Sequence, residues 1–158
     1  MIRDARTTFC TATNVYASAG TAVFGSYIDR TTTPNFDQAR LYLQVWCTTT
    51  FIGVATGTVQ FEMISSAATS GTSPNIHITS GTFPQAATAS LAPLAAGYPI
   101  LIAEVPRGSG IVGAGGAQYL RYIMMQCVTA VETTTAGAVA AFLSLEAGYW
   151  AALPNATQ

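Results

Sequence analysis

The sequence predicts an all-β fold, an antiparallel β-sandwich with an extended N-terminal arm, and three observations support this. Short segments of alternating apolar and polar residues recur along the chain. Glycine, proline and small polar residues separate them. No crossover helices, of the kind that parallel strands need, are evident between them. At 158 residues the chain is long enough for one such domain with a proper core.

The N-terminal arm is predicted at residues 1–34. Small polar residues mix there with isolated aromatic residues, and the segment closes on RTTTP. One or two short strands are expected within it. The sandwich is then expected at residues 35–148 and a C-terminal tail at residues 149–158.

Strands are clearest from Arg40 onward. RLYLQVWCTTTF places Leu43 and Val45 on one face, and TVQFEMI places Phe61 and Met63 on one face. Because only the break GVATG separates the two segments, we expect a hairpin or a close strand pair.

The middle of the chain predicts shorter elements. NIHITS is expected to form a short strand, and one turn of helix is expected near residues 86–91, where prolines prevent a longer one. YPILIAEVP is apolar on both faces except at Glu104, which predicts a strand in the centre of its sheet.

The segment AQYLRYIMMQCVTAV is ambiguous, since its apolar residues have helical spacing. A helix there would support a dinucleotide site, because PRGSGIVGAGG contains G-x-G-x-x-G after an apolar run. About forty residues remain after these glycines, too few for the repeated βαβ units of such a fold. A short polar turn also leads directly into the alternating AVAAFLSLE, which favours a hairpin. We therefore expect a glycine-rich loop between two strands and no bound cofactor.

Composition bears on partners. Charged residues make up 8% of the chain, lysine is absent, and the net charge is −1. An ordinary soluble protein has about 25% charged residues, so we expect that an assembly covers much of this surface; a neutral, threonine-rich monomer is the alternative. Scattered arginines argue against nucleic-acid binding, and no apolar run is long enough to predict a membrane span.

Catalytic and metal-binding residues are not predicted. His77 lies between Ile76 and Ile78 on a short strand, which favours a surface or interface position over a general base. The glutamates are expected to be solvated or paired with arginine. Three cysteines without C-x-x-C spacing predict reduced thiols and no metal site. We expect a protein that is not an enzyme.

A set of segments in fixed order resembles a family of tailed-bacteriophage capsid decoration, or cement, proteins. These segments are LYLQVWCTTTF, GTVQFEMISS, LAAGY, EVPRG, QYLRYIMMQ and TTAGAVAAFLSLE, and they span about two thirds of the chain. The longer GSGIVGAGG loop and the longer ends of this chain depart from the family pattern.

The resemblance implies a jelly roll, in which QYLRYIMMQ is a strand, that assembles as a homotrimer on the major capsid protein. The protein would be made in the host cytoplasm and would lie on the outer surface of the capsid in the virion. A head-fibre or tail receptor-binding β-domain of a phage, which contacts a host glycan or protein, is the alternative.

Aromatic and arginine residues dominate binding hot spots. The candidates for capsid or trimer contacts are therefore Phe9, Tyr16, Phe24, Arg107, Tyr149 and Trp150. The sequence leaves open whether the aromatic residues among them instead fill the sandwich.

Overall fold

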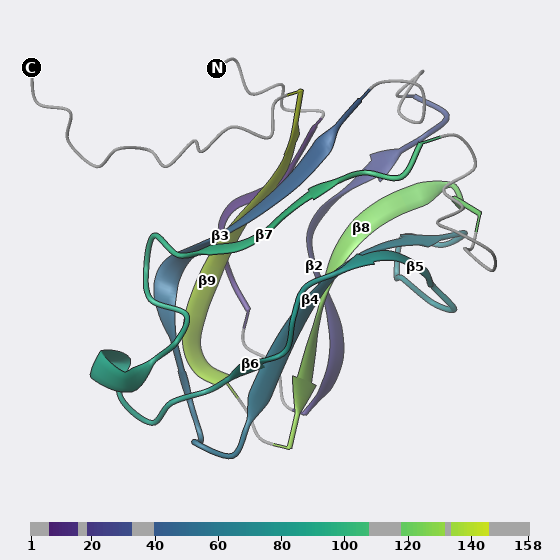
Figure 1. The fold of residues 1–158 in the computed structure, drawn as a ribbon. Coiled ribbons are helices and arrows are strands. Elements are labelled where there is room, and N and C mark those ends of the chain that lie inside the picture. Colours follow the sequence, from purple (N-terminus) through teal and green to yellow (C-terminus); the bar gives the residue numbers. More distant parts are fainter. Residues whose placement is uncertain (1–6, 16–18, 33–39, 108–117, 132–133, 146–158) are drawn as a thin grey trace, which may run out of the picture.

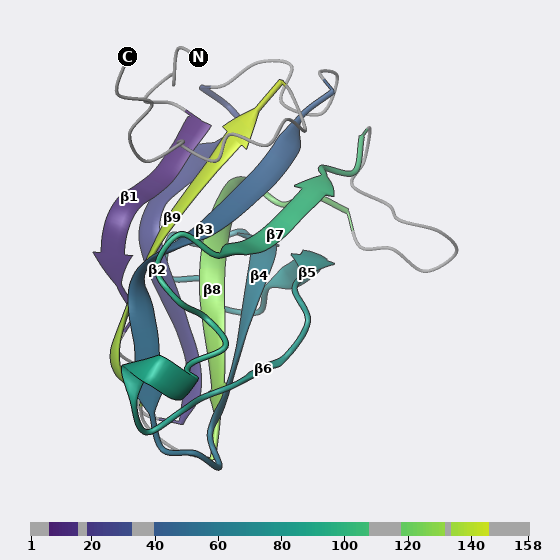
Figure 2. The same ribbon diagram turned by 60° about the vertical axis from the view of Figure 1, so that its left-hand side comes forward.

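The computed structural model describes residues 7–15, 19–32, 40–107, 118–131 and 134–145. Within these residues, nine strands form two antiparallel sheets that pack face to face (Figures 1 and 2), which confirms the predicted β-sandwich. The turn of helix expected near residues 86–91 is present as the 3-10 helix η2 (Ala89–Leu91). No helix among the described residues has the length and hydropathy that crossing a bilayer would require.

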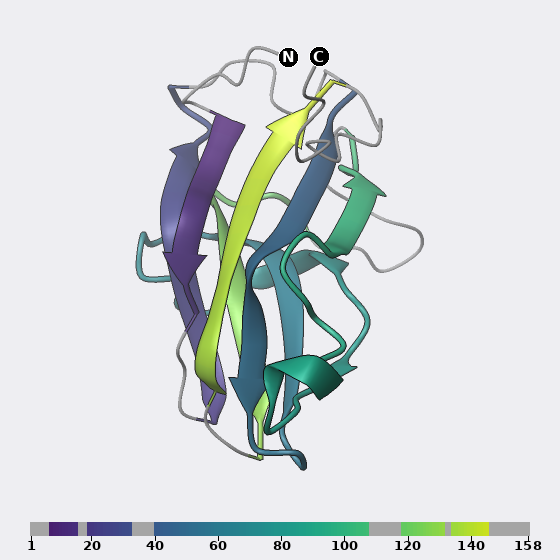
Figure 3. The same ribbon diagram turned by 90° about the vertical axis from the view of Figure 1, so that its left-hand side faces the viewer.

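Four strands form each main layer, and a two-residue strand extends the second. The first sheet, which faces the viewer in Figure 3, has the order β1 (Thr8–Asn14), β9 (Thr134–Ser144), β3 (Tyr42–Gly53) and β7 (Pro99–Glu104). The second sheet has the order β2 (Gly20–Asp29), β8 (Tyr122–Ala130), β4 (Thr58–Ser66) and β5 (Asn75–Thr79), with β6 (Phe83–Pro84) paired to β4.

The order of the strands is that of a jelly roll. The antiparallel pairs β1/β9, β2/β8, β3/β7 and β4/β5 are nested in the chain, like the two arms of one long hairpin that has been rolled into two layers. This nesting is expected for an eight-stranded jelly roll, and β6 is an addition to it.

The core lies between the sheets and follows the alternation in the sequence. Leu43 and Val45 of β3 and Phe61 and Met63 of β4 are all fully buried. The ring of Phe61 makes an edge-to-face contact with that of Phe51, with centroids 5.6 Å apart. Such pairs contribute about 0.5–1.5 kcal/mol beyond the area they bury.

Both hairpin predictions are wrong. The strands β3 and β4 lie in different sheets, as do β8 and β9. Their short connections cross from one layer to the other, so the sequence neighbours face each other across the core instead of pairing. Of the consecutive strands in the described residues, β4 and β5 do form an antiparallel pair within one sheet.

Two further strands differ in structure or position from what the pattern of apolar residues in their sequences indicates. QYLRYIMMQ contributes β8 and not a helix, and its apolar residues are buried on both faces, with Ile123 and Met124 at 0% and 1% exposure. Burial on both faces removes the alternation that identifies a strand. In contrast, β7 is at the edge of its sheet and not at the centre, so its apolar run was misleading.

Where one or two short strands were expected in an extended arm, the N-terminal region contains β1 with seven residues and β2 with ten, and both belong to the sandwich. β1 pairs with β9 in the first sheet, and β2 pairs with β8 in the second. Residues 1–6 lie outside the described part of the chain.

Candidate interaction surfaces at the two ends of the sandwich

Charge is concentrated at one end of the molecule. Among the described residues, every charged side chain except Glu62 lies where β2 and β7 end and β3 and β8 begin, at the upper end in Figure 1. We call this the charged end, and it comprises Asp29, Arg30, Arg40, Glu104, Arg107 and Arg121.

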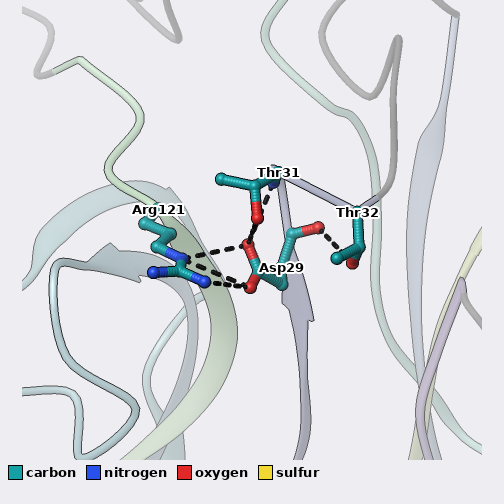
Figure 4. A network of polar contacts seen from close by, with 4 residues as sticks. All are labelled: Asp29, Thr31, Thr32 and Arg121. Carbon is teal, nitrogen blue, oxygen red and sulfur yellow. Dashed lines mark hydrogen bonds and ion pairs between the residues drawn. The ribbon is translucent and has the colours of Figure 1, made fainter.

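An ion pair fixes the end of β2 to the start of β8. Arg121 donates from Nη2 to Asp29 Oδ2 at 2.8 Å and from Nε to both carboxylate oxygens at 3.2 Å (Figure 4). Thr31 adds two hydrogen bonds to Asp29 Oδ1, from its backbone N–H at 2.9 Å and its hydroxyl at 2.8 Å. The hydrogen bonds from Arg121, and then those from Thr31, hold the pKa of Asp29 well below its usual range.

Two aromatic rings extend this network across the outer face of the second sheet. The Arg121 guanidinium lies 4.8 Å from the ring centroid of Tyr122. Tyr122 in turn makes an edge-to-face contact with Tyr27 at 5.1 Å, and Tyr27 is 51% exposed.

A second cluster attaches the chain before β8 to the sheet. The ring of Tyr119 stacks on that of His77 with centroids 4.1 Å apart, and its hydroxyl donates to the carbonyl of Pro106 at 3.0 Å. Ser65 Oγ lies 2.7 Å from His77 Nε2 and accepts from the backbone N–H of Leu120 at 2.9 Å. Ser65 is 0% exposed, so a substrate cannot reach its hydroxyl.

His77 is therefore not on the surface, as its short strand suggested, but buried at 9% exposure. It lies where the pairing of β5 with β4 shifts by one residue, between the partners Ile78 and Ile76. Simple alternation along the strand fails at such a shift, which is why the sequence misplaced it.

The glutamates have two different environments. Glu104 is paired with Arg40 at 3.3 Å and Arg107 at 3.6 Å, as expected for a surface carboxylate. Glu62 is instead buried at 7% exposure in the middle of β4 and accepts from Gln126 Nε2 at 2.5 Å. Glu132 and Glu146 lie outside the described residues.

The opposite end of the sandwich differs in composition. The described residues of its connections contain no Asp, Glu, Lys, Arg or His, and they comprise 15, 19, 53–57, 84–94 and 131. We call this the uncharged end after its described residues, and it is the lower end in Figure 1. The sequence between β8 and β9 also contains Glu132, which lies outside the described residues. Three of its large apolar side chains are exposed, Leu91 at 76%, Val131 at 67% and Val54 at 44%.

Backbone hydrogen bonds hold the uncharged end together. The N–H of Gly53 donates to Ala86 at 3.0 Å, and the N–H of Gln85 donates to Gly57 at 2.8 Å. The Gln85 side chain adds a buried bond from Nε2 to Thr134 Oγ1 at 3.0 Å. Since the backbone fixes the turns, their apolar side chains are left to face outward.

The predicted contact residues do not form one site. Phe9 and Phe24 are buried at 2% and 7% exposure in the core, which is the second of the two roles that the sequence left open. Arg107 is at the charged end, with its side chain 61% exposed. The other three candidates lie outside the described residues, namely Tyr16, Tyr149 and Trp150.

Sequence reasoning missed Leu91, Val131 and the separation of charge between the ends. The sequence does hint at the separation of charge, because arginines are absent from 41–106. To interpret this gap, one must know which connections lie at the same end of the sandwich. That information comes from the topology.

The described residues contain no group of three His, Cys, Asp or Glu side chains that could hold a metal ion. Cys10, Cys47 and Cys127 are free and buried, as expected for reduced thiols. Burial raises the pKa of both Cys47 and Cys127 to about 11. A thiol with a raised pKa is a poor nucleophile at neutral pH.

Comparison with models of known protein families finds no match, and no curated protein matches the chain.

Proposed function

We propose that this chain is a capsid decoration, or cement, protein of a tailed bacteriophage. In this proposal it binds as a homotrimer across junctions between major capsid protein subunits, on the outer surface of the virion, and stabilises the head. Synthesis takes place in the host cytoplasm, and no cofactor or catalytic step is involved.

The observation that carries the proposal is where the family-like segments lie in the jelly roll. LYLQVWCTTTF, GTVQFEMISS and TTAGAVAAFLSLE coincide closely with β3, β4 and β9, and QYLRYIMMQ overlaps the first half of β8. These are the inner strands of the two sheets. The resemblance therefore covers the framework of a fold that viral capsid proteins commonly use.

In this proposal the protein acts by mechanical reinforcement of the shell. A trimer that contacts several capsid subunits resists their separation when packaged DNA presses outward. Each contact needs little affinity, because three linked copies bind with a high effective concentration. The low charge of the chain suits a protein whose surfaces are largely covered in an assembly.

Two measurements test the proposal. Light scattering behind a sizing column should give three times the chain mass of 16.4 kDa. Co-sedimentation with empty shells of the major capsid protein from the same virus should then show saturable binding. A protein that neither forms trimers nor binds shells would contradict the proposal.

A receptor-binding β-domain is the second candidate, and the exposed Tyr27, which contacts the half-buried Tyr122 edge to face, favours it. Exposed aromatic rings bind the apolar faces of sugars. If this role is correct, the protein binds glycans saturably on an array, and Tyr27→Ala abolishes that binding. Shell binding without glycan binding would exclude it.

A further inference from the structure

Each side of the sandwich ends in two edge strands, and the two sides are closed to different degrees. On one side the edges of β1 and β2 touch, because a Cβ on Gly25 would lie 2.6 Å from the carbonyl oxygen of Phe9. On the other side, toward the right in Figure 2, β7 ends the first sheet and β5 ends the second. We call this the open side. Ile78 and Leu101 pack against the core there but are only half-buried.

The outer edge of β7 has backbone groups that point away from its own sheet. The N–H of Val105 donates to the carbonyl of Leu41 at 2.8 Å, which fixes the phase of the ladder between β7 and β3. Bonded pairs alternate along an antiparallel ladder, and the register is unbroken from Leu101 to Glu104. The N–H and C=O of Ile102 therefore point away from β3. Within the described part of the chain they have no backbone partner.

The outer edge of β5 is open in the same way. The N–H of Ser80 donates to the carbonyl of Phe61 at 2.8 Å, and Ile78 pairs with Met63 in the same register. By the same alternation, the N–H and C=O of Thr79 point away from β4. An unpaired strand edge is a template for another strand, so each copy of this chain has two such templates on one side.

The two free edges also match in direction. β7 ends at the charged end, whereas β5 begins there, opposite the last residues of β4. The two strands therefore run antiparallel to each other. A rotation about an axis parallel to the strands preserves both directions, so it can place β7 of one copy antiparallel to β5 of the next. Repetition of this head-to-tail contact closes a ring.

We propose that the open side is the contact between copies of this chain, and that β7 of one copy pairs with β5 of the next around a threefold axis. The inference rests on the proposed function for the number of copies and assigns the contact within the trimer. Ile102 of one copy lies opposite Thr79 of the next, and the two exchange backbone hydrogen bonds. Leu101 and Ile78 of all three copies gather near the axis, where their half-buried side chains become covered.

A second copy fits the open side better than a foreign strand does. A foreign strand pairs with one of the two edges and leaves the other open, whereas the ring uses both edges of every copy. Closure of this kind removes free strand edges altogether. The half-buried Ile78 and Leu101 meet their own counterparts, so apolar surface covers apolar surface.

A pair of cysteines tests the contact directly. A chain with both Ile102→Cys and Thr79→Cys should give covalent trimers when it is oxidised with diamide and separated by electrophoresis without reductant. Within one copy the two positions cannot join, because Leu101 and Ile78 face the core and their sequence neighbours face outward from different sheets, which are about 10 Å apart. Cys10, Cys47 and Cys127 are buried. The two single substitutions are the controls and should give no covalent trimer.

Ile102→Pro tests the backbone pairing itself. The N–H of Ile102 points away from β3, so proline there removes no hydrogen bond within the chain but blocks the partner strand. The control is Ile102→Ala, which also loses the side chain but keeps the N–H. We expect the proline variant to raise the concentration at which the trimer dissociates about tenfold or more above that of the alanine variant, because all three contacts lose a hydrogen bond. Urea unfolding of both variants shows whether the fold is kept.

The outcomes separate this inference from the proposed function. Covalent trimers from the double variant support the open side as the contact, and if these trimers do not bind empty shells, the proposed function alone is wrong. A wild-type trimer whose double variant gives no covalent trimer means that the copies meet elsewhere, which overturns the inference and leaves the proposed function standing. Covalent dimers from Ile102→Cys alone would show that β7 pairs with β7, which also overturns it, as does a wild-type protein that is monomeric in solution.

Discussion

The two ends of the sandwich use different interactions to hold their connections in place. Both ends have backbone hydrogen bonds, but among the described residues only the charged end adds ion pairs and stacked rings. Its side chains face one another, as Arg121 faces Asp29. At the uncharged end Leu91 and Val131 face outward, while the buried Gln85 side chain bonds to Thr134. The comparison teaches that side-chain contacts hold the connections of the charged end, whereas the opposite end relies mainly on its backbone.

The largest expected effect concerns the close packing near the uncharged end. Gly137 has a φ of +150°, and a Cβ there would lie 2.6 Å from Cδ1 of the buried Phe51 ring. Gly137→Ala should lower the free energy of unfolding by about 4 kcal/mol, from strain and overpacking together. Urea unfolding measures this loss.

Gly81→Ala is the control for that variant, because a Cβ at Gly81 meets no heavy atom within 4 Å. Its free energy of unfolding should change by less than about 0.5 kcal/mol. Equal effects of the two substitutions would mean that packing against Phe51 does not determine the stability of this region.

A smaller effect is expected at the charged end. Tyr119→Phe keeps the stacking on His77 but removes the hydrogen bond from the hydroxyl to Pro106. The expected loss in unfolding free energy is about 1 kcal/mol. Tyr119→Ala, which also removes the buried ring, should lose several times more in the same urea experiment. Similar losses for the two variants would contradict a role for the stacked ring.

The ion pair of Arg121 should matter less and depend on salt. Arg121→Gln is expected to lower the melting temperature slightly in dilute buffer, and the difference should vanish near 1 M salt, where the screening length is about 3 Å. Arg107→Gln serves as the control, since Arg107 is more exposed and lies 3.6 Å from its partner. A salt-independent effect of Arg121→Gln would show that packing, and not charge, is responsible.

The smallest expected effect is a dependence on acid pH. The pKa of Asp29 is lowered in the fold, so its contribution to stability is present above the ordinary Asp pKa of about 3.9 and is lost as the pH falls below that value. Asp29→Asn should therefore show a shallower fall in melting temperature than the wild type below about pH 4. Parallel curves for the two proteins would contradict this assignment.

The fold class and most strands could be predicted from the sequence because most strands have one buried, apolar face and one more polar face. The alternation of Phe61 and Met63 with polar neighbours is direct evidence of that face. Pairing could not be predicted, since a short connection can join strands in one sheet or cross between two. The segment of β8 has helical spacing because both of its faces are buried, and the resemblance, not the periodicity, identified it as a strand.

The candidate site was the least predictable part. The aromatic residues were predicted to contact a partner, but Phe9 and Phe24 fill the core. An isolated aromatic residue in a polar segment can occupy either the core or an interface, so the sequence does not distinguish the two. Leu91 and Val131 gave no signal in the sequence. Exposure and backbone conformation, which identify them, are properties of the folded chain.

Binding to the shell tests the central claim most directly. Electron cryomicroscopy of empty shells incubated with the wild-type protein should show trimers on the outer surface, across junctions between capsid subunits. Shells that remain bare at saturating protein would contradict the account, as would protein bound as single copies.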